Sequence, residues 1–151
     1  MVDAMTSAPA DGRYADATVG TQPIQFSLAT PLTGRPRVTE RHADGVTAIY
    51  VVDPAELVLI GHFPGFPIFP GVCLIECAHQ AALLALSGNV TLAAVERARF
   101  FAPVFPGDEI TARVAVAGHT CRAELSVRRG ADGHGEDAAL IRLRYREGEH
   151  R

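Results

Sequence analysis

The residues best suited to chemistry lie within one stretch of the chain, residues 61–80. His62 stands in a segment, residues 61–71, that holds three prolines and three glycines and so cannot form a regular helix or strand. The prolines restrict where the imidazole can point, and histidine near neutral pH can act as a general base. A lone loop histidine is more often an ordinary exposed residue, so the role of His62 depends on its neighbours.

Glu76 is a carboxylate within a segment, residues 72–86, that is apolar on nearly every side apart from Glu76, His79 and Gln80. A helix that is hydrophobic all round belongs in the middle of a domain. Burying an ionised carboxylate there is costly, which favours the protonated form and suits Glu76 to act as an acid. The alternative is that Glu76 lies on a solvent-facing edge, or is held by Gln80 one turn along.

Gly71 lies between these two residues, directly after Pro70 and at the start of the predicted helix. Its backbone N–H is then one of the unsatisfied donors of a helix N-terminus, with the helix dipole behind it. Such a donor suits a developing oxyanion. A base, an acid and an oxyanion donor together suit removal of a proton next to a carbonyl, followed by departure of a β-substituent.

Strand and helix patterns on both sides of this stretch predict the elements that must position it. Residues 37–41 and 46–52 are rich in β-formers and are separated by an Asp-Gly pair, which predicts a hairpin. Asp53 is a suitable N-cap and Pro54 suits the first helical position, so a short helix is predicted from there to Gly61. Four strand-like segments follow the apolar helix, at residues 91–101, 109–117, 120–129 and 138–146.

No helix separates these four segments, so we expect them to pair as an antiparallel meander. Alternation of apolar and polar residues, clearest at residues 110–116 and 141–145, gives the sheet one apolar face. That face needs cover, and the helix that begins near Gly71 is the one apolar enough to provide it. We therefore predict an α+β fold in which an antiparallel sheet wraps around a long central helix.

Composition sets the broad limits for the 151 residues. Residues 1–21 lack periodicity and are expected to be a disordered tail, so that residues 22–151 form a single domain. A net charge of −3 does not indicate a nucleic-acid-binding surface, and the longest apolar run is too short to span a bilayer. Three cysteines and no secretion signal fit a reducing cytoplasm. Cys73 and Cys77 are expected to be small core residues with no metal, because no full ligand set is evident.

The first of two motifs is His62-Phe63-Pro64-Gly65-x-Pro67-x-x-Pro70-Gly71-Val72, which is followed by Glu76 and Gln80. The second motif is the run of residues 100–108. Both motifs resemble those of one enzyme family, the β-hydroxyacyl-acyl carrier protein dehydratases of the FabZ type. The spacing of fourteen residues between His62 and Glu76 also agrees. The resemblance is specific over residues 61–108 and looser toward the C-terminus.

The resemblance implies a hotdog fold and a homodimer with active sites at the interface, where His62 of one subunit faces Glu76 of the other. Hexamers of three dimers and heterodimers are further assemblies to expect. The implied reaction turns a (3R)-3-hydroxyacyl thioester on acyl carrier protein into the trans-2-enoyl thioester. His62 would take the α-proton, Glu76 would protonate the departing hydroxyl, and the Gly71 N–H would polarise the thioester carbonyl. No metal or redox cofactor is implied, since the acyl group arrives on the phosphopantetheine of the carrier.

Substrate contacts are expected from the same stretch. Phe66 and Phe69 flank the loop and would line an acyl tunnel, although ordinary packing between subunits is the alternative. Several arginines could receive an acidic carrier, or could simply be a solvated strand face: Arg97, Arg99, Arg128 and Arg129. The predicted substrate-binding residues are Phe63, Phe66, Pro67, Phe69 and Gln80.

The chain also departs from that family. Residues 29–36 do not match the Pro-His-Arg segment of the dehydratases of primary fatty-acid synthesis, which favours a specialised polyketide or unusual lipid pathway. The related dehydratase-isomerases carry aspartate where this chain has Glu76, so isomerisation is less expected. Two other functions stay open: a hotdog thioesterase in which Glu76 activates water, which leaves His62 unused, and a non-catalytic partner subunit of a heterodimeric dehydratase.

Overall fold

The structure is a computed structural model that describes residues 32–61, 65, 67–130 and 133–149. These belong to one compact unit, Pro31–Arg151. The predicted tail at residues 1–21 and four residues of the first motif, His62, Phe63, Pro64 and Phe66, lie outside the described residues.

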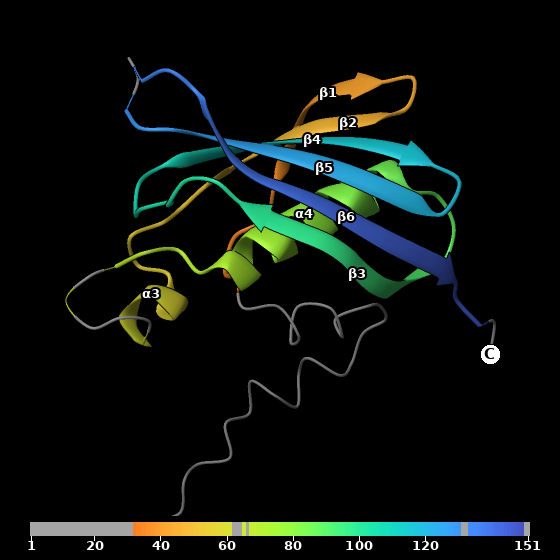
Figure 1. The fold of residues 1–151 in the computed structure, drawn as a ribbon, viewed down its shortest axis with the longest axis horizontal. Coiled ribbons are helices and arrows are strands. Elements are labelled where there is room, and N and C mark those ends of the chain that lie inside the picture. The colour runs from red at the N-terminus through yellow and green to blue at the C-terminus, as the bar shows by residue number, and fades with distance from the viewer. Residues whose placement is uncertain (1–31, 62–64, 66, 131–132, 150–151) are drawn as a thin grey trace, which may run out of the picture. The chain divides into compact units, whose positions relative to one another are not determined.

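Six antiparallel strands form a single curved sheet (Figure 1). Its order, β1-β2-β4-β5-β6-β3, confirms the predicted pairing of β4, β5 and β6 but contradicts the predicted place of β3. β4 already has β2 on one side and β5 on the other, so β3 pairs with β6 at the far edge. The strands are β1 Arg37–His42, β2 Gly45–Val51, β3 Val90–Phe100, β4 Glu109–Ala117, β5 Thr120–Arg128 and β6 Glu136–Glu147.

The predicted hairpin is confirmed by β1 and β2, which are joined by a turn at Ala43 and Asp44. Gly45 is required where this hairpin meets β4, because a Cβ atom at Gly45 would lie 1.7 Å from the backbone oxygen of Val114. The Asp44 carbonyl also accepts a hydrogen bond of 2.7 Å from the Val116 N–H. The turn is therefore held against the end of β4.

Two helices follow β2, α3 Leu57–Gly61 and α4 Gly71–Ala85. The prediction that the first helix starts at Pro54, with Asp53 as its N-cap, is wrong by about one turn, although its end at Gly61 is right. The Asp53 side chain accepts a hydrogen bond of 2.8 Å from the Ala55 N–H, and its carbonyl accepts one of 2.9 Å from the Glu56 N–H. This local bonding folds residues 53–56 into a turn, which competes with helix formation.

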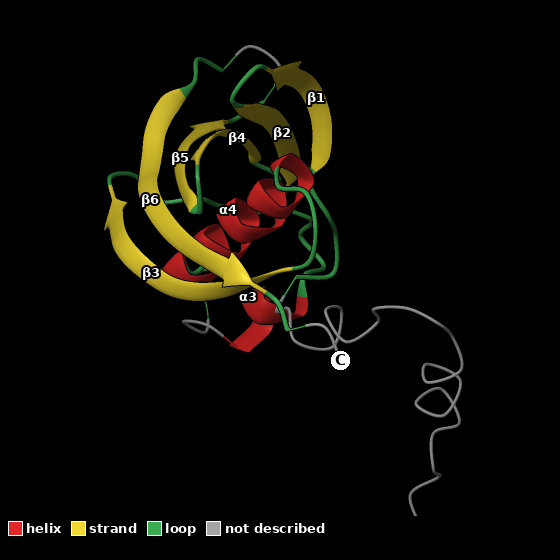
Figure 2. Ribbon diagram, turned by 90° about the vertical axis from the view of Figure 1, so that its right-hand side faces the viewer, coloured by secondary structure: helices red, strands yellow, loops and turns green. Residues whose placement is uncertain are grey.

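α4 lies along the concave face of the sheet, which curves around it (Figure 2). Six residues of α4 are buried against the sheet: Cys73, Leu74, Cys77, Ala78, Ala81 and Ala82. The sheet contributes the predicted alternating residues, among them Ile110, Val114, Ile141 and Leu143. This arrangement confirms an antiparallel sheet wrapped around a central helix.

The other face of α4 is not covered by the described residues of this chain. Val72 is 62% exposed and Leu84 is 39% exposed. Among the described residues, the sheet covers one face of α4 and no second layer covers the other, so this part of the chain does not bury the helix on every side as predicted. None of the helices in the described part of the chain is long and apolar enough to cross a membrane.

Candidate active site

The N-terminus of α4 opens onto a hollow of about 410 Å³. Gly71 is the first helical residue, and the Pro70 carbonyl accepts hydrogen bonds from the N–H groups of Cys73 and Leu74, at 2.9 and 3.3 Å. A Cβ atom at Gly71 would lie 2.9 Å from the Phe100 ring, so glycine lets this ring lie over the helix start. The hollow is lined by Ile68, Phe69, Gly71, Leu74, Phe100, Phe101, Ala102, Pro103 and Val104.

Both sequence motifs contribute to this hollow, because the backbone joins them directly. The Phe69 N–H of the first motif donates a hydrogen bond of 2.8 Å to the Val104 carbonyl of the second. The second motif is held in turn by the buried carboxylate of Asp108, which accepts hydrogen bonds from the Phe105 N–H at 2.9 Å and pairs with Arg129 Nε at 3.3 Å. The two loops therefore form one wall beside the helix start.

Glu76 lies on α4 and is half-buried. Its Oε1 accepts a hydrogen bond of 3.0 Å from the Gln80 side-chain amide, one turn along the helix. This contact is the one that the sequence offered as the alternative for Glu76, in which Gln80 holds the carboxylate one turn along the helix. These two residues follow the hollow along α4 and are not among the described residues that line it.

Some of the remaining predicted site residues lie near the hollow or on α4, and the others lie in the part of the loop that the structure does not describe. Phe69 is 2% exposed, and its ring centroid lies 6.2 Å from that of Tyr50, so it belongs to the core while also forming a wall of the hollow. Pro67 is exposed. The structure thus brings Phe69 and Gly71 together and places Glu76 and Gln80 on the same helix. The roles of these residues, and those of His62, Phe63 and Phe66, stay predictions.

Glu56 is a buried carboxylate whose position no sequence pattern indicated. It is 0% exposed, and it accepts hydrogen bonds from the Tyr50 hydroxyl and, at 3.1 Å, from the Thr33 N–H. The pKa of Tyr50 is raised, mainly by burial and secondly by the adjacent Glu56. Its phenol therefore stays protonated and can donate this hydrogen bond. The Glu56 carbonyl also accepts a hydrogen bond of 3.0 Å from the Leu59 N–H. Glu56 therefore fixes the start of α3, which leads directly to His62.

His79 and Tyr145 form a second polar contact that the sequence did not indicate. His79 Nδ1 lies 2.8 Å from the Tyr145 hydroxyl, and the two rings stack with centroids 5.7 Å apart. Burial lowers the pKa of His79 against the opposing effect of Glu76, and burial raises the pKa of Tyr145. At neutral pH the pair is therefore an uncharged imidazole bonded to a phenol. The contact joins residues 66 positions apart, so no local pattern could have revealed it.

The cysteines lie in the core, which confirms that Cys73 and Cys77 are small core residues. All three are free and buried. Burial raises the pKa of Cys73 and of Cys121 to about 11, and that of Cys77 well above its ordinary value. Thiols in these surroundings stay protonated at neutral pH and are poor nucleophiles.

The architecture is that of the hotdog fold, of α+β class, and solved structures share it. One similar structure is the dehydratase heterocomplex ApeI:P from Xenorhabdus doucetiae, with a TM-score of 0.61 and 19% identity over 74% of this chain and 98% of that one. Another is an acyl-CoA hydrolase from Agrobacterium tumefaciens, with a TM-score of 0.56 and 22% identity over 74% of this chain and 46% of that one. At these identities the likeness establishes the fold alone.

Sequence comparison places the chain more narrowly. The model of the ApeI-like family, described as ApeI dehydratase, matches residues 38–137, which is more than half of the chain. The protein belongs to the ApeI-like dehydratase family.

Curated relatives named 3-hydroxyacyl-[acyl-carrier-protein] dehydratase FabZ support the same placement. The protein of Ehrlichia chaffeensis is 39% identical over 89 residues, which are 54% of this chain and 62% of that protein. A protein of Thermus thermophilus is 48% identical over 58 residues, which are 33% of this chain and 41% of that protein. The matches thus span less than two thirds of either relative's length.

Proposed function

We propose that this protein is a dehydratase that converts a (3R)-3-hydroxyacyl thioester, carried by acyl carrier protein, into the trans-2-enoyl thioester. The observation that carries the proposal is the hollow at the N-terminus of α4, which both motifs line and onto which Gly71 opens. Membership of the ApeI-like dehydratase family and the FabZ relatives support the same reaction.

The thioester carbonyl would lie at the helix start, where the Gly71 N–H and the helix dipole stabilise negative charge as it develops on the carbonyl oxygen. Removing one donor of this kind typically costs roughly 3 kcal/mol of transition-state stabilisation. The apolar lining from Phe69, Leu74 and Phe100 suits an acyl chain rather than a charged substrate.

Proton transfer would be divided between two side chains. His62 would remove the α-proton, and the electron pair of that C–H bond would become the new double bond. Glu76 would give a proton to the β-hydroxyl as the C–O bond breaks, so that water leaves. The hydrogen bond from Gln80 to Glu76 Oε1 holds the carboxyl group in one orientation for this step. His62 enters this mechanism from the sequence motif.

The site would be completed by a second copy of the chain. The face of α4 that carries Glu76 also carries Val72, exposed to 62%, and β3 is an edge strand with exposed Val95 and Phe100. A second copy would cover this face and supply the facing His62. Structural neighbours include a dehydratase heterocomplex and a hexameric thioesterase, so larger or mixed assemblies are further outcomes to test. Free buried thiols suit a reducing cytoplasm.

The pathway we propose is a specialised one, of polyketide or unusual lipid type, because residues 29–36 lack the Pro-His-Arg segment expected in primary fatty-acid synthesis. This part of the proposal predicts a preference for acyl chains of one length or branching pattern. Assay of a series of 3-hydroxyacyl chains on one carrier tests it, and equal rates across the series would contradict it.

The central experiment follows 3-hydroxyacyl thioesters on carrier protein by intact mass and ultraviolet absorbance. We expect the wild-type protein to remove one water and to generate the absorbance of a conjugated enoyl thioester. His62→Ala and Glu76→Gln should each lose at least about a hundredfold in kcat/KM, as general acid–base catalysis usually contributes.

Each contrary result identifies another function. Release of the free acid by the wild-type protein would show a thioesterase. If the protein by itself converts no substrate, but does so after a second hotdog subunit is added, it is a partner subunit of a heterodimeric enzyme. If both variants dehydrate the substrate as fast as the wild-type protein, the proposed reaction stands but the proposed roles of His62 and Glu76 are refuted.

A further inference from the structure

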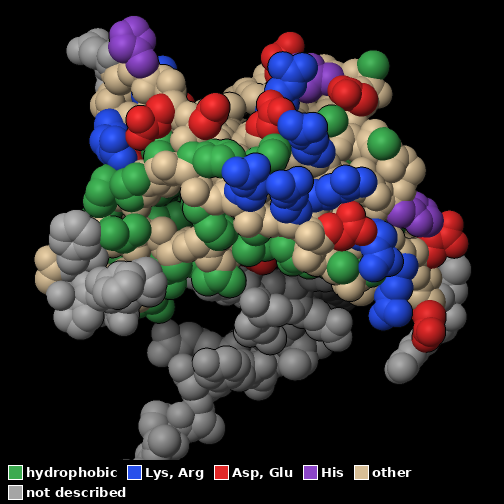
Figure 3. Space-filling view, in the orientation of Figure 1, with side chains coloured by type: hydrophobic (Ala, Val, Ile, Leu, Met, Phe, Trp, Pro, Cys, Tyr) green, Lys and Arg blue, Asp and Glu red, His purple; other side chains and the backbone are tan. Residues whose placement is uncertain are grey.

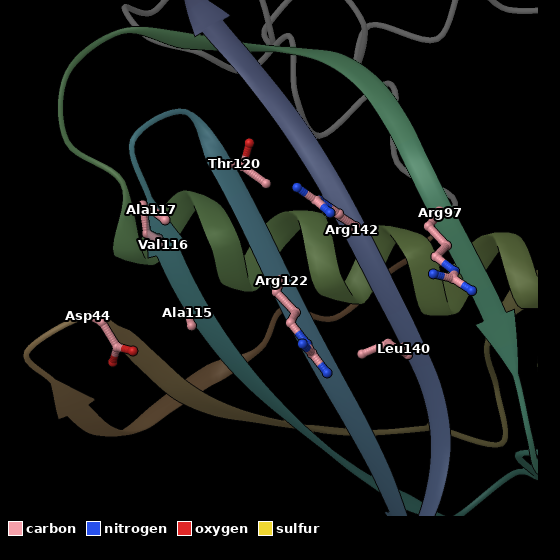
Figure 4. Close-up of a pocket in the computed structure, with 9 residues that line it drawn as sticks. All are labelled: Asp44, Arg97, Ala115, Val116, Ala117, Thr120, Arg122, Leu140 and Arg142. Carbon is pink, nitrogen blue, oxygen red and sulfur yellow. The ribbon is translucent and has the colours of Figure 1, made fainter.

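Three arginines lie side by side across the outer face of the sheet. Arg97 of β3 is directly opposite Arg142 of β6, and Arg142 is directly opposite Arg122 of β5. Their side chains lie on the face away from α4, because the neighbouring Ile141 and Ala123 point inward and are buried. Figure 4 shows the three side chains over adjacent strands, and Figure 3 shows basic side chains gathered in a line across this face. We call Arg97, Arg122 and Arg142 the arginine row.

The row is electrostatically unfavourable in the isolated chain. Like charges directly opposite each other on neighbouring strands destabilise a sheet. Glu96 is the main compensating group, and its carboxylate is shared between Arg142 Nε at 3.2 Å and Arg144 Nε at 2.8 Å. Arg122 has an exposed contact of 3.4 Å with Glu124, whereas Arg97 has no ion pair among the described residues. A chain of net charge −3 has thus gathered four arginines around two carboxylates in one place.

A hollow of about 530 Å³ runs along the row and gives it a concave surface. Its floor is formed in part by the small side chains of Ala115 and Ala117, which are much shorter than the arginine side chains around them. Three arginines line this hollow together with one carboxylate, that of Asp44. Guanidinium groups raised around an apolar floor fit carboxylates that project from another surface.

Two of the other arginines that the sequence singled out, Arg128 and Arg129, form ion pairs within the fold. Arg128 pairs with Glu109 at 3.1 Å, and Arg129 pairs with Asp108 at 3.3 Å while donating to the Pro103 carbonyl at 2.9 Å. Arg129 therefore holds the second motif in place. Of those candidates for carrier binding, Arg97 is the one that belongs to the row.

The row is also close to the candidate active site. Phe100, whose ring lies over Gly71, is three residues from Arg97 on β3. At the rise of a β-strand this is a separation of about 10 Å. A protein bound on the row would therefore hold an extended prosthetic arm within reach of the helix start.

We propose that the arginine row, extended by Arg144, is the docking surface for the acidic carrier protein that brings the thioester substrate. This inference rests on the proposed function, since it names the surface that receives the substrate. Clustered positive charge speeds the approach of an acidic partner and fixes its register, and both effects weaken as salt is added.

The test compares two substrates that carry the same 3-hydroxyacyl group, one on purified holo-acyl carrier protein and one on a short pantetheine thioester. Arg142→Glu and Arg122→Glu should each lower kcat/KM for the carrier substrate by roughly tenfold or more at low salt, mainly through KM. The short thioester should be converted at the wild-type rate within about twofold, because it makes no contact with the row.

Arg113→Glu is the matched control. Arg113 is exposed on β4, and its cross-strand neighbours are Thr47 and Glu124 rather than arginines. The charge change is the same as in the row variants, so a general effect of net charge would appear in all three. Equal losses in the control and in the row variants would overturn the proposal.

Binding of fluorescently labelled holo-carrier, measured by anisotropy, makes the docking test independent of turnover. Weaker binding by the Arg142→Glu and Arg122→Glu proteins, with the wild-type protein inactive in the dehydratase assay, would refute the proposed function and support the docking surface. Wild-type dehydration with unchanged carrier binding in both variants would refute the docking surface alone. A changed subunit number in either variant, measured by light scattering, would assign the row to a contact between copies and overturn the proposal.

Discussion

At the scale of single residues, Gly71 and Glu56 have roles that their residue types alone do not indicate. Gly71 matters because it has no side chain: the space beside it belongs to the Phe100 ring. Glu56 matters because it is buried and fully bonded, with the Tyr50 hydroxyl and the Thr33 N–H as donors. Both residues can be tested by small substitutions with distinct expected results.

We expect Gly71→Ala to lower dehydration by roughly tenfold to a hundredfold with little loss of stability, because misplacement of reacting groups by about 1 Å is enough for such an effect. The added Cβ meets Phe100, which is 49% exposed and can move. Steady-state kinetics and a thermal melt measure the two effects. A second substitution, Phe100→Leu, should restore part of the activity, and failure of both the loss and the rescue would refute the packing argument.

Glu56→Gln should destabilise the fold by about 1–3 kcal/mol, because the amide nitrogen that replaces one carboxylate oxygen cannot accept a hydrogen bond from Thr33 or Tyr50. Urea unfolding measures this change. Tyr50→Phe should cost a similar amount, and the double variant should cost less than the sum, since the two residues share one bond. Additive losses would contradict the pairing.

At the scale of the elements, α4 joins the core to the site. Its inner face carries two thiols under the sheet, and its N-terminus carries the candidate oxyanion donor. The burial that holds the helix in place also changes how the thiols titrate, because it disfavours their charged form. The stability of the element should therefore depend on pH at the alkaline end.

The free energy of unfolding should fall as pH rises from about 9 to about 11. The ordinary pKa of a cysteine thiol here is 9.0, and burial raises the pKa of Cys73 to about 11 in the fold. In this range the unfolded chain loses the thiol proton while the folded chain keeps it, so high pH favours unfolding; below pH 9 both states are protonated and the contribution is constant.

Urea unfolding at several pH values measures the slope. Cys73→Ala should reduce it, by a contribution on the order of 1–3 kcal/mol across the range. Asp53→Ala, in the exposed turn before α3, is a control that should leave the slope as it is. An unchanged slope in Cys73→Ala would show that Cys73 does not titrate with the fold.

At the scale of the whole molecule, the described chain leaves one side of α4 and the β3 edge uncovered. Exposed apolar residues on α4 and unpaired strand edges favour association with another chain. If the partner is a second copy, the face that carries Glu76 becomes the wall of a shared site.

Val72→Asp should therefore weaken self-association at least tenfold, because a carboxylate would be buried without a partner in the interface. Light scattering over a range of concentrations measures the subunit number. Val51→Asp is the control, since Val51 is similarly exposed, at 55% against 62%, but lies at the end of β2. A monomeric wild-type protein, or equal effects of both substitutions, would contradict the proposed dimer.

Mixing the inactive His62→Ala and Glu76→Gln proteins should restore about a quarter of the wild-type activity after subunit exchange. Random pairing makes half of the dimers mixed, and each mixed dimer would have one intact site. No recovery, with exchange confirmed by mass, would place both residues of each site within one subunit.

The sequence by itself determined the α+β class, the hairpin, the helix that starts at Gly71 and the inward residues of β4 and β6. Each of these rests on a local pattern: proline before a helix start, an apolar run, or alternation along a strand. The sequence also offered the pairing of Glu76 with Gln80 as an alternative, because residues four apart on a helix are neighbours, and the structure contains it.

Only the tertiary structure decided the features that join distant parts of the chain. The place of β3 beside β6 depended on β2 taking the free side of β4, which no local pattern records. The hydrogen bonds of Glu56 with Thr33 and of His79 with Tyr145, and the cross-strand pairing of Arg97 with Arg142, likewise join residues more than twenty positions apart. Such neighbours are set by how the sheet curves around α4, and the candidate site is built where that curvature brings the two motifs together.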